Sequence, residues 1–207
     1  MFSSLSFSGF FSKVQDSHWY AEYLKPVVAE VEPLSSVLDI GTGSGKLLQM
    51  LAIQKQATCF GTDTNPGMIR EAGKKLNGFN IKIKLVKPGG FLPFPAQQFD
   101  CITICNVLFN LESKQANQLV YDSVRLLKPG GKVVVLTPSG TGNFKKLYKQ
   151  FLPDLNPSVF LWFQATRSKG LAWNHKNLCY DLSQIYHLNY EKKEVFDGLG
   201  TLEIMSK

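Results

Sequence analysis

The chain has 207 residues, of which 44% are hydrophobic and 19% charged. This composition is typical of a folded globular protein and excludes a disordered or fibrous one. The length fits one domain, residues 1–207, with a sizeable core. No apolar stretch approaches the roughly 20 residues that cross a bilayer, and the Phe-rich start lacks the basic region and cleavage site of a secretory signal. We therefore expect a cytoplasmic protein without membrane insertion.

The formal net charge of +7 is compatible with nucleic acid, anionic lipid or an acidic substrate. The lysines, however, are spread along the chain, with no arginine-rich tract and no basic cluster interleaved with aromatic residues. A solvated surface explains this charge better than a nucleic-acid interface does. A small-molecule substrate is the favoured partner, and the composition leaves the oligomeric state open.

The cysteines and histidines do not form a recognisable metal or disulfide pattern. The four cysteines show no Cys-x-x-Cys spacing, and the three histidines are scattered. These residues are Cys59, Cys101, Cys105 and Cys179, with His18, His175 and His187. We expect reduced, structural cysteines and no metal.

Short apolar runs alternate with amphipathic stretches up to Pro138. Strands are predicted at residues 37–40, 58–62, 80–86, 99–107 and 133–136, and helices at 46–54, 66–75 and 115–127. Pro129-Gly130-Gly131 is expected to end the last of these helices. This alternation predicts an α/β fold with an open, doubly wound, mostly parallel sheet and helices on both faces. Ligands bind such sheets at the carboxyl ends of the strands.

The pattern changes after Pro138. Residues 139–185 are rich in aromatic side chains, including Phe144, Trp162 and Trp173. Two strand-like runs then flank the turn Asp197-Gly198-Leu199-Gly200, which predicts a C-terminal hairpin.

The most informative segment is Asp39-Ile40-Gly41-Thr42-Gly43-Ser44-Gly45, which follows the first predicted strand. Glycines in such a turn permit close backbone approach to a nucleotide-like ligand at a helix N-terminus. A P-loop is excluded, because Ile40 stands where its first glycine belongs and Leu47 follows Lys46. A dinucleotide fingerprint is weakened but still open, because Lys46 replaces its last glycine.

An acid followed by Gly-x-Gly-x-Gly resembles the first motif of the class I S-adenosylmethionine-dependent methyltransferases. The segment Gly61 to Ile69, with Asp63, resembles the second-strand segment of that family, whose acid accepts hydrogen bonds from ribose hydroxyls. The segments 99–108 and 126–131 resemble its later motifs, and residues 201–207 its antiparallel seventh strand. The resemblance implies a Rossmann-like, seven-stranded sheet with an antiparallel C-terminal hairpin strand.

The resemblance also implies S-adenosyl-L-methionine as cofactor and a set of binding residues. These are Asp39, Gly41, Thr42, Gly43, Gly45, Asp63, Thr64, Met68, Gly90, Phe91 and Asn106. One departure concerns adenine: many relatives carry an acid after the third strand, whereas this chain reads Val86-Lys87-Pro88-Gly89-Gly90-Phe91. Either backbone groups and stacking on Phe91 replace the acid, or this segment is simply a flexible turn.

Methyl transfer from a sulfonium needs chiefly in-line alignment, so a general base is optional and no catalytic residue is assigned. His18, Tyr20, His175 and His187 are the candidates by residue type. By analogy with relatives, an N-terminal helical cap at residues 1–33 and the aromatic insertion at 139–185 are expected to cover the substrate side. Two alternatives stay open: a non-catalytic cofactor-binding or partner-binding module, and an NAD-dependent oxidoreductase.

Overall fold

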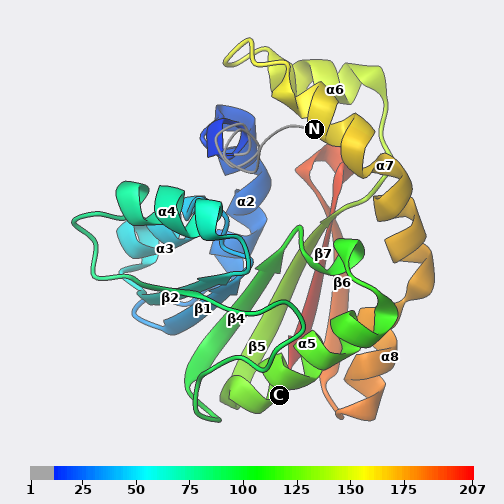
Figure 1. The fold of residues 1–207 in the computed structure, drawn as a ribbon. Coiled ribbons are helices and arrows are strands. Elements are labelled where there is room, and N and C mark those ends of the chain that lie inside the picture. The colour runs from blue at the N-terminus through cyan, green and yellow to red at the C-terminus, as the bar shows by residue number, and fades with distance from the viewer. Residues whose placement is uncertain (1–11) are drawn as a thin grey trace.

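The computed structural model describes residues 12–207 and contains one seven-stranded sheet in the order β3-β2-β1-β4-β5-β7-β6 (Figure 1). Its strands are β1 (Ser36–Ile40), β2 (Thr58–Asp63), β3 (Lys82–Leu85), β4 (Phe99–Cys105), β5 (Leu127–Pro138), β6 (Asn189–Val195) and β7 (Gly200–Ser206). The first five are parallel, whereas β7 runs antiparallel between β5 and β6. The predicted sheet, with its antiparallel C-terminal hairpin strand, is confirmed.

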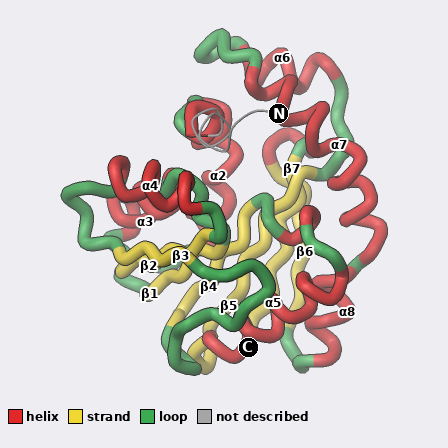
Figure 2. The backbone as a smooth tube through the Cα atoms, in the orientation of Figure 1, coloured by secondary structure: helices red, strands yellow, loops and turns green. Residues whose placement is uncertain are grey.

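Helices cover both faces of the sheet, as expected (Figure 2). They are α2 (His18–Glu30), α3 (Lys46–Lys55), α4 (Pro66–Lys75), α5 (Ser113–Leu126), α6 (Phe144–Phe151), α7 (Ser158–Lys176) and α8 (Leu178–Ile185), with short 3-10 turns η1 (Leu108–Asn110) and η2 (Phe196–Gly198). Of the predicted cap at 1–33, residues 1–11 lie outside the described part; residues 12–15 are helical and α2 follows. No helix within residues 12–207 is long and apolar enough to span a membrane.

Alternation along the strands divides the core into two layers. On one face, Val37, Cys101 and Val134 pack with α2 and α3. On the other face, Leu38 and Ile102 pack with α5 and α8. Strands buried on both faces read as continuous apolar runs, which explains why the sequence around β4 lacks alternation.

Two predicted elements differ from the structure. The third strand is shorter than residues 80–86 and lies at the sheet edge. Apolar and basic residues alternate over 80–86, which predicts Ile81, Ile83 and Leu85 on one inward face, but Leu85 is 50% exposed. The fifth strand is longer, because pairing with β4 begins at Leu127 and resumes at Lys132 after a register shift. The helix α5 therefore ends at Leu126, before the Pro129-Gly130-Gly131 segment, which forms part of β5.

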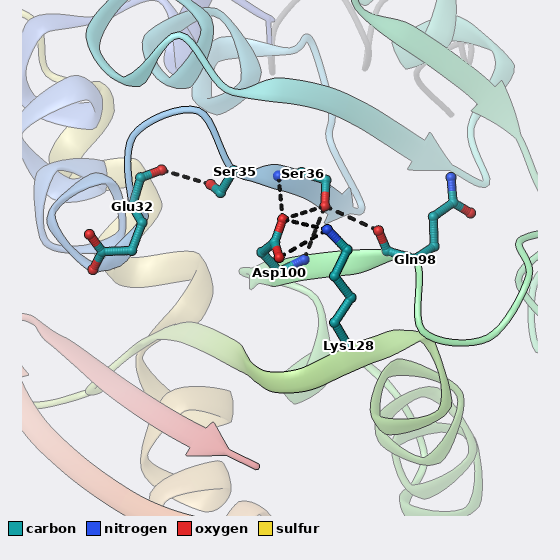
Figure 3. Close-up of polar contacts among 6 residues, drawn as sticks. All are labelled: Glu32, Ser35, Ser36, Gln98, Asp100 and Lys128. Carbon is teal, nitrogen blue, oxygen red and sulfur yellow. Dashed lines mark hydrogen bonds and ion pairs between the residues drawn. The ribbon is translucent and has the colours of Figure 1, made fainter.

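The amino ends of β1 and β4 are joined by a polar cluster (Figure 3). The Asp100 carboxylate accepts hydrogen bonds from the Ser36 backbone N–H at 2.8 Å and the Ser36 hydroxyl at 2.6 Å. The Lys128 ammonium lies 2.9 Å from the same carboxylate. Partial burial opposes ionisation, but the Ser36 hydrogen bonds and the Lys128 charge lower the pKa of Asp100 to about 2. This cluster lies at the amino ends of the strands, whereas α/β sheets bind ligands at the carboxyl ends, so its role is structural.

Candidate functional site

A cavity of about 400 Å³ opens at the carboxyl ends of β1, β2, β3 and β4. Its volume lies in the range of small-ligand sites, and its position is where α/β sheets bind ligands. The wall is contributed by the turn after β1, the ends of β2 and β4, the loop after β3, the N-terminal helical segment, the region of η1 and α5, and α7. Among the lining residues are Val14, Gln15, Tyr20, Ile40, Gly41, Gly43, Asp63, Thr64, Asn65, Met68, Gly89, Gly90, Leu92, Asn106, Val107, Trp162 and Thr166.

The glycine turn is held against the end of β2. The backbone N–H groups of Gly41 and Thr42 both donate to the Thr62 carbonyl, at 2.8 and 2.9 Å. Gly41 has a φ of +76°, and a Cβ there would lie 2.3 Å from a methyl of Val107. Only glycine fits both the left-handed backbone and this close approach. The turn thereby presents bare backbone to the cavity.

Asp63 lies at the end of β2 and faces the cavity. One carboxylate oxygen accepts a hydrogen bond from the Gly43 N–H at 2.9 Å, and the other from the Asn65 N–H at 2.8 Å. A carboxylate offers about four acceptor sites, so each oxygen keeps one lone pair for a ligand. The two backbone donors fix the orientation of a group that can accept from vicinal hydroxyls.

Asp39, in contrast, lies behind the turn and does not line the cavity. Its side chain is 2% exposed and accepts a hydrogen bond from the Thr103 hydroxyl at 2.8 Å. Burial raises the pKa of Asp39 to about 6. The structure therefore places Asp39 as a support of the turn. Thr42 and Gly45 also stay outside the cavity wall, whereas Met68 and Thr64 form part of it.

Asn106, immediately after β4, joins two tyrosines of α2. Its side-chain oxygen accepts a hydrogen bond from the Tyr23 hydroxyl at 3.0 Å, and its amide donates to the Tyr20 hydroxyl oxygen at 3.3 Å. Asn106 has a φ of +60°, a left-handed conformation that asparagine tolerates better than most residues. Burial raises the pKa of Tyr20 well above its usual value, so its hydroxyl stays protonated. Tyr20 thus brings a neutral donor to the cavity wall.

The loop after β3 forms another wall, through Gly89, Gly90 and Leu92. Phe91 is 67% exposed and is not among the lining residues, so the structure does not bring it to the cavity. An acid that the sequence pattern did not reveal, Asp122 of α5, lines the cavity instead. Its carboxylate is already engaged by the Leu92 N–H and the Arg125 guanidinium. Unlike Asp63, Asp122 is almost fully buried, at 1% exposed, so its main role is to hold the loop after β3.

The sequence analysis expected the segments 1–33 and 139–185 on the substrate side but assigned none of their residues to the binding site; several of them line the cavity. Gln15 lies over the glycine turn, where its side-chain oxygen accepts a hydrogen bond from the Ser44 N–H at 2.8 Å. Trp162 and Thr166 of α7 form the wall beyond Asn106. No motif marks these residues, since their proximity depends on how the terminal helices pack on the sheet. The three histidines are not among the lining residues.

The aromatic segment divides between the two sides of the molecule. Trp162 lines the cavity, whereas Trp173 packs in the opposite core layer and donates to the buried Glu203 carboxylate at 3.1 Å. All four cysteines are free and buried, and burial raises the pKa of each thiol. Such thiols are unreactive core groups.

Known methyltransferases are similar to this chain in sequence. Residues 37–131 match a family described as a methyltransferase domain. The chain is 35% identical over 150 residues to the demethylmenaquinone methyltransferase of Tropheryma whipplei (strain Twist), covering 72% of this chain and 60% of the relative. It is 35% identical over 165 residues to the ubiquinone/menaquinone biosynthesis C-methyltransferase UbiE of Bordetella parapertussis, covering 77% of this chain and 57% of that protein. The chain thus spans about 60% of the length of such relatives.

Solved structures agree on the fold. A SAM-dependent methyltransferase from Aquifex aeolicus superposes with a TM-score of 0.71 at 16% identity, covering 96% of this chain and 97% of that one. A putative S-adenosyl-L-methionine-dependent methyltransferase from Methanococcus maripaludis gives 0.72 at 20% identity, covering 98% and 93%. The resemblance noted in the sequence is confirmed: the chain is similar in sequence to methyltransferases and shares the fold of class I methyltransferases, whose cofactor is S-adenosylmethionine.

Proposed function

We propose that this chain binds S-adenosylmethionine in the cavity and transfers its methyl group to a small, largely apolar acceptor. The observation that carries the proposal is that one cavity joins the glycine turn and Asp63 to a wall containing Val107 and Trp162. The first part suits a nucleoside, and the second suits an aromatic or aliphatic molecule.

The residues of the first part fit the cofactor. Gly41 and Gly43 of the glycine turn line the cavity, and Asp63 keeps acceptor lone pairs for the two ribose hydroxyls. Met68, which is 6% exposed, supplies an apolar surface beside them. We propose that adenine lies against the backbone of Gly89 and Gly90, without stacking on Phe91.

The acceptor is proposed to lie between Asn106, Tyr20 and α7. Trp162 and Val107 offer apolar surface there, and the Tyr20 hydroxyl can donate to an oxygen of the acceptor. The relatives named above are quinone methyltransferases, which makes a phenol or quinol ring the first acceptor class to test.

The bound cofactor would supply a sulfonium methyl group that needs no further activation. This chain's own contribution is then to hold the acceptor in line with that methyl and to exclude water. Positioning of this kind supplies roughly 7 to 11 kcal/mol of a barrier. Tyr20, held by Asn106 through the hydrogen bond at 3.3 Å, is the group best placed to orient the acceptor.

A non-catalytic cofactor-binding module is the second candidate. The observation favouring it is that Asp122, the acid beside Gly90 and Leu92 in the described cavity wall, is 1% exposed and held by Leu92 and Arg125 rather than presented to adenine. It predicts cofactor binding without turnover. An NAD-dependent oxidoreductase has only the glycine turn and Asp63 in its favour.

The test is transfer of a labelled methyl group from S-adenosylmethionine to a panel of phenols, quinols and amines. We expect turnover on an apolar phenol or quinol with the native chain. Thr166→Phe should fill the acceptor half, so that transfer falls at least about tenfold while S-adenosylhomocysteine affinity stays within about twofold. No turnover on any acceptor, despite tight S-adenosylhomocysteine binding, would favour the non-catalytic module.

A further inference from the structure

Helix α6 and the chain that follows it expose an unusual number of large apolar side chains. This group, called the α6 surface below, lies at the top of the view in Figure 1. Its members are Phe144, Tyr148, Leu152, Leu155 and Leu161, each between 48% and 71% exposed. Several large exposed apolar side chains in neighbouring segments of a folded protein are a candidate interaction site.

Phe144, Tyr148 and Leu152 of the α6 surface lie on α6 and its C-cap, Leu155 lies in the turn that follows, and Leu161 lies on α7. Phe144, Tyr148 and Leu152 follow one another at four-residue spacing and therefore share one side of the helix. The Leu147 side chain points the other way and is 4% exposed. The Phe144 ring stacks on Phe160 of α7 with ring centres 5.5 Å apart, which holds it in its outward position.

Basic residues border this apolar stripe. Lys145, Lys146 and Lys149 lie within α6, which contains no acid. Asp154, between Leu152 and Leu155, accepts hydrogen bonds from the backbone N–H groups of His18 and Asn156. Lys149 is 3.0 Å from Asp197, but both side chains are substantially exposed, and such ion pairs are weak. A stripe of aromatic and aliphatic side chains flanked by lysines is the pattern of helices that lie in the plane of a membrane interface.

We propose that the α6 surface binds an anionic lipid bilayer, with the aromatic stripe among the headgroups and the lysines against lipid phosphates. The helix behind it also forms the cavity wall: α7 exposes Leu161 on the outside and presents Trp162 and Thr166 to the cavity. Membrane contact would therefore bring the acceptor side of the cavity close to lipid. The chain could then take a lipophilic acceptor directly from the bilayer. This role rests on the proposed function, whereas the lipid contact does not.

The test is flotation of the full chain with vesicles of phosphatidylcholine alone or mixed equally with phosphatidylglycerol. We expect binding to the anionic vesicles that weakens with salt. Phe144→Ser combined with Tyr148→Ser should lower the partition coefficient at least about tenfold. Lys145→Gln should lower it roughly fivefold on anionic vesicles only.

Two control variants match these changes elsewhere on the molecule. Tyr180 of α8 is 47% exposed, nearly the same as Tyr148, and Lys114 of α5 is an exposed lysine. Tyr180→Ser and Lys114→Gln should leave vesicle binding unchanged. Circular dichroism and thermal melting of every variant show whether the fold is kept. Loss of flotation by a Phe144→Ser, Tyr148→Ser variant that is still folded supports the proposal.

Three results would overturn it. The first is no flotation of the native chain with anionic vesicles. The second is equal loss of binding in the Tyr180 or Lys114 variant, which would indicate nonspecific adsorption. The third is a native dimer that Phe144→Ser and Tyr148→Ser convert to a monomer without changing flotation, because the α6 surface would then be an interface between two copies. Since S-adenosylhomocysteine binding is measured separately, failure here leaves the proposed function standing.

Discussion

Asp39 shows how far a motif residue's role depends on its surroundings. The sequence places it beside the glycines as a cofactor-binding acid, and the structure buries it behind them, bound to Thr103. Burial raises the pKa of Asp39 to about 6. In the unfolded chain the pKa of an aspartate is about 3.9, so ionisation of Asp39 opposes folding. The contribution of this group to stability is therefore present at low pH and lost as the pH rises from about 4 to about 6.

We accordingly expect Asp39→Asn to gain stability relative to the native chain as the pH rises through that window, by up to about 3 kcal/mol. An asparagine side chain can keep the hydrogen bond from Thr103 without a buried charge. Urea unfolding of both chains between pH 4 and pH 7 gives the difference, with the exposed Asp181→Asn as control. A difference that does not vary with pH would show that Asp39 is not the titrating group.

Some residues that line the cavity belong to sequence motifs, whereas others reach the cavity only through tertiary packing. Gly41 and Gly43 are predictable from the first motif, and Asp63 from the second-strand segment; all three line the cavity. Gln15 and Trp162 were not predictable, because they are far from those motifs in sequence and reach the cavity through the packing of the terminal helices. Phe91 was adjacent in sequence to lining residues, yet its side chain points to solvent.

The turn between β1 and α3 is the element on which the site depends most. Gly41→Ala should lower the free energy of unfolding by about 2 kcal/mol or more, because it combines a positive φ with a clash against Val107. Gly78→Ala is the matched control, since Gly78 also has a positive φ but no atom within 4 Å of a Cβ.

The Gly41 variant should lose more stability than the Gly78 variant in chemical unfolding, and it alone should weaken S-adenosylhomocysteine binding. Equal losses in both variants would show that the close approach of Val107 to the turn has no energetic consequence.

The pairing of β1 with β4 depends at its amino end on Asp100. The pKa of Asp100 is lowered to about 2, so its stabilising effect is present above about pH 4 and is lost as the pH falls toward 2. Because the side chain is 42% exposed, we expect Asp100→Asn to cost only about 1 kcal/mol at neutral pH. Unfolding curves at pH 7 and pH 3 test this, with the exposed Glu32→Gln as control. A deficit that is as large at pH 3 as at pH 7 would contradict it.

Helices and strands were predicted best where their apolar residues are buried and regularly spaced along the sequence. The order and type of the strands up to β5, and the C-terminal hairpin, follow from alternating strand and helix signals. The edges were less predictable: Leu85 alternates as an inward residue, but β3 has a neighbour on one side only, so its face is partly uncovered. Similarly, the early start of β5 depends on pairing with β4, which no local pattern encodes.

For the whole molecule, the sheet order determines where the site forms. The carboxyl ends of β1, β2 and β4 lie side by side at one end of the sheet. The glycine turn, Asp63 and Asn106 lie at those ends. The antiparallel β7 is paired with β5, and α7 reaches from the cavity wall to the opposite core layer. The fold and the residues proposed to bind the cofactor thus follow largely from sequence motifs, whereas the region proposed to hold the acceptor depends on tertiary packing.

The measurement that tests the central claim most directly is calorimetric titration with S-adenosylhomocysteine and with NAD. We expect the native chain to bind S-adenosylhomocysteine but not NAD, and ligand at 100 times its dissociation constant to stabilise the fold by about 2.7 kcal/mol. Asp63→Asn should weaken binding at least about tenfold, and Asp100→Asn, at the opposite end of the strands, should not. NAD binding without S-adenosylhomocysteine binding would contradict the account and indicate a nicotinamide-dependent enzyme.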